Sequence, residues 1–255
     1  MVNGILAAAV SGVSAQAGRV GVAADNIANL STPAYKRHEV QSRTLVTRQT
    51  STTAHAPGGV QAIPRQLADV QGVLAPSVTA TDLAIAGRGY FPVSGRVDGG
   101  ETLYTRDGSF RPDADGYLVN SGGGYLLGRT GGDGPLAPVN VANAFGGVSV
   151  SEDGRVSVLD ATGDSRTAAR VPLARFANSQ GLQAVGGNAF RATAVSGQPF
   201  LETATGIQSG ALELSNTDLG TEFANLIVAE TAYGASLKMI EAADQMSARL
   251  LDIRG

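Results

Sequence analysis

The residue types that most often do chemistry are scarce in this chain, and they are scattered. The 255 residues include two histidines and no cysteine, which excludes a thiol nucleophile, a thiolate metal site and a disulfide. His38 and His55 lie near no carboxylate pair with ligand spacing, and we expect both to be surface histidines of polar loops. Ser109 and Ser121 have no histidine or lysine partner at a recognisable spacing. The sequence therefore predicts no catalytic residue.

Two glycine-containing segments imitate ligand loops without completing them. Gly87-Arg88-Gly89 begins like a dinucleotide fingerprint but lacks the third glycine and the helix that should follow. The DADG segment at 113–116 resembles the start of a calcium loop, yet Leu118 and Val119 resume a strand at once, so we expect a hairpin turn. We predict no cofactor, no metal ligand and no enzymatic activity.

Composition narrows the partners that the chain can have. Charged residues make up 16% of the chain and the net charge is −3, which gives no electrostatic reason to expect nucleic-acid binding. No run approaches the ~20 apolar residues that cross a membrane, so we expect no membrane insertion. The first basic residue is Arg19, and a secretory signal peptide would need a positive charge before its apolar core. The default location is the cytoplasm, unless a dedicated export route reads other signals.

Both ends of the chain carry apolar residues at helical spacing. Residues 3–30 and 218–253 each predict one long helix, and Asp218 is placed to cap the second with Glu222 in its first turn. The N-terminal stripe consists of Leu6, Val10, Val13, Ala17, Val20, Ala24 and Ile27. The C-terminal stripe consists of Leu226, Tyr233, Leu237, Ile240, Ala243, Met246, Leu250 and Ile253. Such stripes must pack against something, either the rest of this chain or other copies of it.

The middle of the chain changes from helical periodicity to short strands. Residues 31–75 are rich in polar residues and predict an extended connector with one possible hairpin, and 51–59 predict a loop. From 76 onwards, short β-prone runs at 83–85, 90–93, 103–105, 117–119, 125–127, 148–150 and 156–158 alternate with turn signals. Asp-Gly pairs at 98–99, 107–108, 115–116, 133–134 and 153–154 suit tight turns with positive φ.

These patterns predict an α+β fold with three parts. Residues 1–30 and 215–255 would pair as a helical, coiled-coil domain. Residues 31–75 would be the connector, and 76–214 would be a mainly antiparallel β-domain. Two interpretations of the paired helices remain open from the residues alone. They associate with other copies, or they cap the β-domain of a monomeric soluble binding module.

Four motifs resemble those of the bacterial flagellar axial proteins, which form the rod and hook, and they occur in the same order along the chain. The first is DNIANLSTPAYKR at 25–37, which is similar to the family signature A-N-N-(I/L)-A-N-x-x-T-x-(G)-(F/Y)-K. The matching positions are Asn26, Asn29, Thr32, Pro33, Tyr35 and Lys36, and the departures are Asp25 and Ala34. The segments at 81–91, 104–119 and 212–233 resemble the family's later motifs, with Glu230-Thr231 in place of the usual Gln-Arg.

The resemblance implies a structural subunit, most like a rod protein and alternatively a short hook-like subunit. It implies a helical tube lined by the terminal helices, with copies of this chain and other flagellar axial proteins as partners. It also implies export through the flagellar type III apparatus without a cleaved signal peptide. The location would be the bacterial flagellum, in the basal-body rod that crosses the periplasm or in the hook. The assembly interface would include both terminal stripes, and the tube would transmit torque and conduct exported subunits.

Overall fold

The computed structural model describes residues 2–45, 58–131, 134–142, 144, 147–160 and 164–252. His55 and most of the loop expected at 51–59 lie outside these residues, as do Asp133 and Ile253. Contacts divide the chain into two compact units, which are described separately below. The helical unit comprises Met1–Leu30, Arg37–Leu67 and Thr217–Gly255, and the β unit comprises Ser31–Lys36 and Ala68–Asn216.

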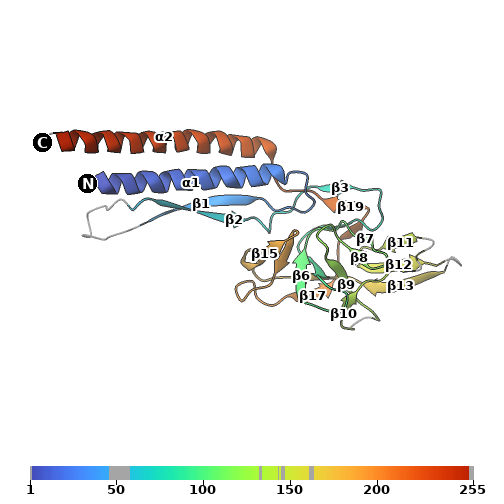
Figure 1. The fold of residues 1–255 in the computed structure, drawn as a ribbon. Coiled ribbons are helices and arrows are strands. Elements are labelled where there is room, and N and C mark those ends of the chain that lie inside the picture. Colours follow the sequence, from blue (N-terminus) through green and yellow to red (C-terminus); the bar gives the residue numbers. More distant parts are fainter. Residues whose placement is uncertain are drawn as a thin grey trace. The chain divides into compact units, whose positions relative to one another are not determined.

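Two long helices pack side by side in the helical unit (Figure 1). Helix α1 (Val2–Ala28) has 27 residues and α2 (Leu219–Asp252) has 34, so both predicted helices are confirmed. Asp218 caps α2, because its Oδ1 accepts hydrogen bonds from the N–H and hydroxyl of Thr221 at 2.8 and 2.6 Å. These bonds hold the pKa of the Asp218 carboxyl below its ordinary value. Within the described residues, neither helix combines the length and apolarity that crossing a membrane requires.

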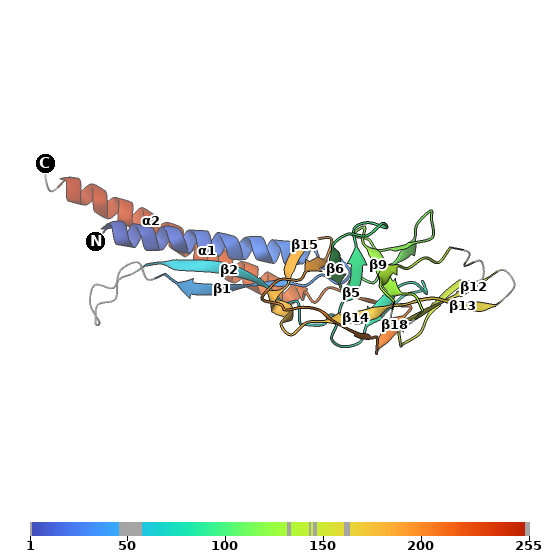
Figure 2. The same cartoon turned by 90° about the horizontal axis from the view of Figure 1, so that it is seen from below.

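A two-stranded ribbon covers another side of α1 (Figure 2). Strand β1 (His38–Thr44) pairs antiparallel with β2 (Val60–Gln66). The ribbon is fastened to the helix by polar contacts: Ser11 Oγ accepts from the Val60 N–H at 3.1 Å, and Arg19 donates to Ser42 Oγ at 2.7 Å. The expectation that His38 belongs to a surface loop is wrong, because His38 is a half-buried residue of β1. The His38 backbone lies against α1 and bonds to Asn26. The sequence around His38 is polar and does not indicate this contact.

The β unit is built from antiparallel strands. The largest sheet has the order β11-β12-β13-β9-β5-β6-β16-β15, with β10 and β8 added on β9 and β7 paired with β8. Three further pairs are β14-β17, β18-β4 and β19-β3. The strands are β3 (Leu74–Pro76), β4 (Leu83–Ile85), β5 (Phe91–Ser94), β6 (Thr102–Thr105), β7 (Arg111–Pro112), β8 (Leu118–Val119), β9 (Tyr125–Arg129), β10 (Leu136–Pro138), β11 (Gly147–Val150), β12 (Arg155–Leu159), β13 (Ser165–Arg170), β14 (Pro172–Arg175), β15 (Gln183–Gly186), β16 (Ala189–Arg191), β17 (Phe200–Thr203), β18 (Ile207–Ser209) and β19 (Ala211–Glu213). The predicted antiparallel β architecture is confirmed.

The core of the β unit is apolar and aromatic. Phe91 and Phe110 are fully buried and meet edge to face with ring centroids 5.7 Å apart. Leu83, Leu126 and Val156 are buried in the same cluster, so strands from β4 to β12 share one core. Strands β4 and β5 are buried along their whole length, and a second buried cluster contains Tyr90, Tyr104 and Phe190.

Glycines in the Asp-Gly pairs serve two different purposes. Gly99, Gly116 and Gly154 adopt positive φ, as tight turns require. Gly108 and Gly134 do not, which corrects the expectation for those two pairs. A Cβ on Gly108 would lie 1.7 Å from the Leu83 carbonyl oxygen. Glycine at 108 is required by close backbone approach, which the sequence alone cannot distinguish from a turn.

Candidate assembly surface

The residues that could have formed a reactive site serve the fold. The Asp113 carboxylate accepts from the N–H groups of Asp115 and Tyr117 at 3.0 and 2.8 Å, which closes the hairpin turn between β7 and β8. Ser109 and Ser121 donate their hydroxyls to the buried Asp107 carboxylate at 2.7 and 2.6 Å. Both serines therefore satisfy a buried anion.

The side of α2 that faces its partner elements repeats at heptad spacing. Successive steps of 4 and 3 residues connect positions that are buried or half-buried, whereas most of the helix is exposed. These seam residues are Glu222, Leu226, Ala229, Tyr233, Ser236, Ile240, Ala243 and Ser247. Many of them are small, and a Cβ on Gly12 of α1 would lie 3.1 Å from Ser236 Oγ. The two helices therefore approach closely because small residues line their seam.

The structure distributes the predicted C-terminal stripe over more than one side of α2. It brings Leu226, Tyr233 and Ile240 into the seam and leaves Leu237 and Met246 39% and 44% exposed. The backbone of Leu250 belongs to α2, while Ile253 lies outside the described residues. The large exposed side chains remain available to a partner outside this chain, so their assignment to an assembly interface stays a prediction.

The N-terminal stripe is distributed in a similar way. Leu6, Val13, Val20 and Ile27 are half-buried, whereas the remaining three positions are exposed. The exposed positions are Val10, Ala17 and Ala24, and Val10 is 51% exposed. Among the α1 residues whose burial is described, the buried apolar ones are instead Ala9, Ala15 and Ala23. Small residues fill the packed sides of α1, and part of the predicted stripe is left facing solvent.

Sequence reasoning included Leu237 and Met246 in the C-terminal stripe but missed five other exposed apolar residues of α2. At about 100° per residue, the large exposed side chains form two strips, one on each flank of the seam. Strip A consists of Leu219, Phe223, Ile227 and Leu237, and strip B consists of Val228, Met239 and Met246. The signal that could have found them is apolarity on nearly all sides of the helix, which is typical of a helix surrounded by partners.

Asn26 of the resemblance motif holds the ribbon of the helical unit in place. The Asn26 side chain is fully buried; its Nδ2 donates to the His38 carbonyl at 2.8 Å and its Oδ1 accepts from the His38 N–H at 2.9 Å. Burial lowers the pKa of His38, and the Asp25 carboxylate opposes part of that shift. Asn29 donates to the Asp25 carbonyl at 2.9 Å, near the end of α1. The two motif amides therefore fix how α1 ends and where β1 begins.

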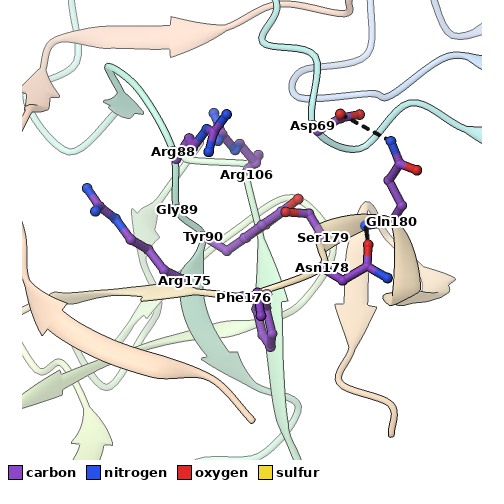
Figure 3. A pocket seen from close by; sticks show the side chains of 11 residues that line it. Asp69, Arg88, Gly89, Tyr90, Arg106, Arg175, Phe176, Asn178, Ser179 and Gln180 are labelled. Atoms are coloured by element: carbon purple, nitrogen blue, oxygen red, sulfur yellow. Dashed lines mark hydrogen bonds between the residues drawn. The ribbon is translucent and has the colours of Figure 1, made fainter. Parts of the chain in front are cut away.

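Cavities of a few hundred Å³ occur in both units, and one of each unit is described here. The cavity of the helical unit, about 340 Å³, is lined by α1, β1 and α2 and includes Arg37 and Glu222. These two side chains form an ion pair at 3.5 Å. The cavity of the β unit, about 380 Å³, is lined by arginine, aromatic and amide side chains (Figure 3). Neither cavity presents a convergent set of acid, base and nucleophile.

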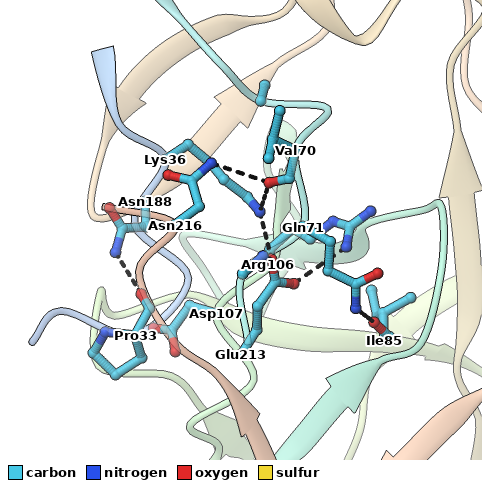
Figure 4. A network of polar contacts seen from close by, with 12 residues as sticks. Pro33, Lys36, Val70, Gln71, Ile85, Arg106, Asp107, Asn188, Glu213 and Asn216 are labelled. Carbon is cyan, nitrogen blue, oxygen red and sulfur yellow. Dashed lines mark hydrogen bonds and ion pairs between the residues drawn. The ribbon is translucent and has the colours of Figure 1, made fainter. Parts of the chain in front are cut away.

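The other motif residues belong to the β unit, where Lys36 is part of a buried charge cluster (Figure 4). The Lys36 ammonium pairs with the Glu213 carboxylate and donates to the Val70 carbonyl at 2.7 Å. Arg106 approaches the other oxygen of Glu213 at 3.2 Å. All three side chains are at most 5% exposed. Burial lowers the pKa of Lys36, while Glu213 opposes that shift.

The backbone on both sides of this cluster is fixed as well. Ala34 adopts a φ of 56° although it is not glycine, and its N–H donates to the Glu213 carbonyl at 2.8 Å. The Pro33 carbonyl accepts from Asn188 at 2.9 Å, and the Tyr35 N–H donates to the Thr32 carbonyl at 3.3 Å. Residues 31–36 are therefore held by backbone bonds as well as by the buried lysine.

Three family models match segments of this chain that overlap the four resemblance motifs. Residues 6–36 match the flagella basal body rod protein family, 84–158 match the flagellar hook protein FlgE/F/G D1 domain, and 208–253 match the flagellar basal body rod FlgEFG protein C-terminal family. The chain is 31% identical to the flagellar basal-body rod protein FlgG of Bacillus subtilis (strain 168), over 96% of this chain and 97% of that protein.

Further relatives include both rod and hook proteins. The flagellar basal-body rod protein FlgG of Caulobacter vibrioides is 34% identical over 94% of this chain and 95% of its own length. The flagellar hook protein FlgE of Brucella abortus is 44% identical, but the match covers 55% of this chain and 36% of that protein. The chain therefore belongs to the family of flagellar basal-body rod and hook proteins, which are structural proteins and not enzymes.

Proposed function

We propose that this chain is a structural subunit of the flagellar axial tube, in the basal-body rod. Copies would associate helically through their terminal helices, together with other flagellar axial proteins, into a tube that transmits torque and conducts exported subunits. The observation that carries the proposal is the pair of exposed apolar strips on α2, in a chain that resembles rod proteins along nearly its whole length. Exposed apolar surface of this extent on one helix marks a site of association.

The placement of the strips favours an open array over a closed dimer. Strip A and strip B lie on opposite flanks of the seam, so one copy offers apolar surface to two neighbours. Contacts between unlike surfaces do not close on themselves and generate a helical polymer. A monomeric binding module with self-capping helices would instead cover these side chains with its own β-domain and would not polymerise, so the experiments below distinguish the two.

Rod is favoured over hook by the extent of similarity. The two rod relatives are matched over 97% and 95% of their own length, whereas the hook relative is matched over 36%. The match thus covers nearly the whole of a rod protein but only part of a hook protein. A short hook-like subunit is the alternative within the same family, supported by the higher identity over the shared segment.

The same proposal assigns a role to each of the three parts of the subunit. Residues 1–30 with 215–255 would form the inner coiled-coil domain, 31–75 the connector and 76–214 the outer β-domain. Heptad spacing along the α2 seam supports the coiled-coil assignment. Delivery to the periplasm or hook would use the flagellar type III export apparatus, without a cleaved signal peptide.

Two single substitutions test the assembly role. Phe223→Asp in strip A and Met239→Asp in strip B each place a charge on an exposed apolar position, so we expect each to reduce the polymer fraction at least tenfold. Helix content should be unchanged because neither residue lies in the seam. The readouts are sedimentation, electron microscopy of the polymer, and circular dichroism.

Gln245→Asp is the matched control, because it adds the same charge at an exposed polar position of α2. It should polymerise like the parent chain. Normal polymers from both strip variants would refute the proposal. A parent chain that stays monomeric at every concentration, by light scattering, would instead support the self-capped binding module.

A further inference from the structure

Three arginines line the cavity of about 380 Å³ in the β unit. Arg88, Arg106 and Arg175 line it together with the Asp69 carboxylate and the aromatic rings of Tyr90 and Phe176 (Figure 3). At about 380 Å³ the cavity is large enough for a small polar group and its hydration water. The proposed structural function does not use this cavity.

Arg106 contributes a buried guanidinium group to the wall of the cavity. It is 4% exposed and stacks over Tyr90, with its guanidinium carbon 5.3 Å from the ring centroid. One terminal nitrogen donates to Glu213 at 3.2 Å and the other to the Gly87 carbonyl at 2.8 Å. The buried Nε–H has no hydrogen-bond partner among the described residues. A buried donor left unpaired is costly and is typically satisfied by water or a ligand.

The charges around Arg106 do not balance. The buried cluster contains two cations, Lys36 and Arg106, and one anion, Glu213. The nearby Asp69 carboxylate is exposed and accepts a hydrogen bond from Gln180 at 3.2 Å. Because Asp69 is in contact with solvent, its attraction for the buried cations is weakened by screening. A surplus positive charge therefore remains beside the cavity.

The other two arginines add to that surplus. Arg88 is exposed and forms no ion pair with any residue the structure describes. Arg175 pairs with Glu202 at 3.2 Å, but the two side chains are 45% and 53% exposed. An ion pair this exposed contributes little free energy and can exchange partners. Guanidinium groups bind carboxylate and phosphate oxygens through paired N–H donors, so the cavity is suited to an oxyanion.

We propose that this cavity is an oxyanion-binding site, and that its occupant in the assembled tube is an aspartate or glutamate carboxylate of a second copy of this chain. The chain has 22 acidic against 19 basic residues, so its copies offer many carboxylates. In an array of unlike contacts, a cavity on one copy meets a different surface of the next. The identity of the occupant rests on the proposed function, whereas the oxyanion site itself does not.

The first experiment tests the site in the monomeric full-length protein, with inorganic phosphate as the probe. The arginine Nε–H resonance of Arg106 is followed by ¹H–¹⁵N NMR during a phosphate titration at constant ionic strength. We expect a saturable shift, and we expect Arg88→Gln to weaken the apparent affinity about fivefold or more, since one charged donor is lost.

Arg111→Gln is the matched control, because Arg111 is an exposed arginine of β7 that does not line the cavity. It should leave the titration unchanged. The absence of a saturable shift would overturn the oxyanion site, and so would an equal loss of affinity in Arg88→Gln and Arg111→Gln, which would show only a general charge effect.

The second experiment tests the occupant by comparing polymer growth of Arg88→Glu and Arg111→Glu. A neighbouring carboxylate in the cavity predicts at least tenfold slower elongation for Arg88→Glu alone, and slowing of the parent chain by phosphate. Equal growth of the two variants, with phosphate binding intact, overturns the second copy as occupant and assigns the site to a free anion. If the parent chain does not polymerise, both the proposed function and the second copy as occupant are refuted. The phosphate titration still tests whether the cavity binds an oxyanion.

Discussion

At the scale of single residues, the buried cluster of Lys36, Glu213 and Arg106 is where one substitution should matter most. Glu213 is in direct contact with both cations, and its Oε1 also accepts from the Gly72 N–H at 2.8 Å. Removing the partner of a buried charge costs far more than an intact pair contributes, because the remaining charge stays desolvated. The neighbouring backbone, at Ala34 and Gly72, depends on the same residue.

Glu213→Gln should therefore destabilise the β unit by about 3–5 kcal/mol. The measurement is urea unfolding followed by tyrosine fluorescence, since the chain has six tyrosines and no tryptophan. Glu101→Gln is the control, because Glu101 pairs with Arg191 at the surface, where the side chains are 52% and 43% exposed. If the two variants lose the same stability, Glu213 does not neutralise the buried cations.

At the scale of elements, the seam between α1 and α2 depends on small residues. A Cβ on Gly12 would lie 3.1 Å from Ser236 Oγ, whereas a Cβ on Gly21 would have nothing within 4 Å. The two glycines lie in the same helix and carry the same penalty in helix propensity. They therefore separate the packing requirement of the seam from the backbone preference of the helix.

Gly12→Leu should destabilise the helical unit by about 1–3 kcal/mol, because the added side chain forces the helices apart. Gly21→Leu should stabilise α1 by about 0.5–1 kcal/mol through better helix propensity. Thermal unfolding monitored by circular dichroism at 222 nm compares the two. Stabilisation by both substitutions would show that the helices do not need close approach at Gly12.

The elements and the pairing of the two helices could be predicted from the sequence, but most of the detailed contacts could not. Apolar periodicity predicted both helices, and short runs between turn residues predicted the strands, because each signal is local. Part of the seam escaped prediction, because residues such as Ala229 and Ser236 carry little hydrophobic signal. The ion pair between Lys36 and Glu213 joins positions 177 residues apart, so no spacing rule reveals it. The resemblance motif marked Lys36 as a family residue without indicating its partner.

At the scale of the whole molecule, the two strips on α2 make the growth of a polymer sensitive to defective copies. If unlike contacts form the array, a copy damaged in strip A still binds a growing end through strip B. Such a copy adds to the polymer and then presents a surface that cannot accept the next subunit. A copy damaged in both strips cannot add at all, so it should leave growth unchanged.

Phe223→Asp, mixed with the parent chain at about one part in ten, should therefore shorten the polymers several-fold, because bound variants stop further addition. The double variant Phe223→Asp/Met239→Asp at the same ratio should have no effect, which makes it the matched control. Polymer lengths measured by electron microscopy decide between them. Equal shortening by both variants would mean that the strips are not separate contact surfaces. No shortening by Phe223→Asp, despite its own failure to polymerise, would mean that subunits associate through closed pairs before they add.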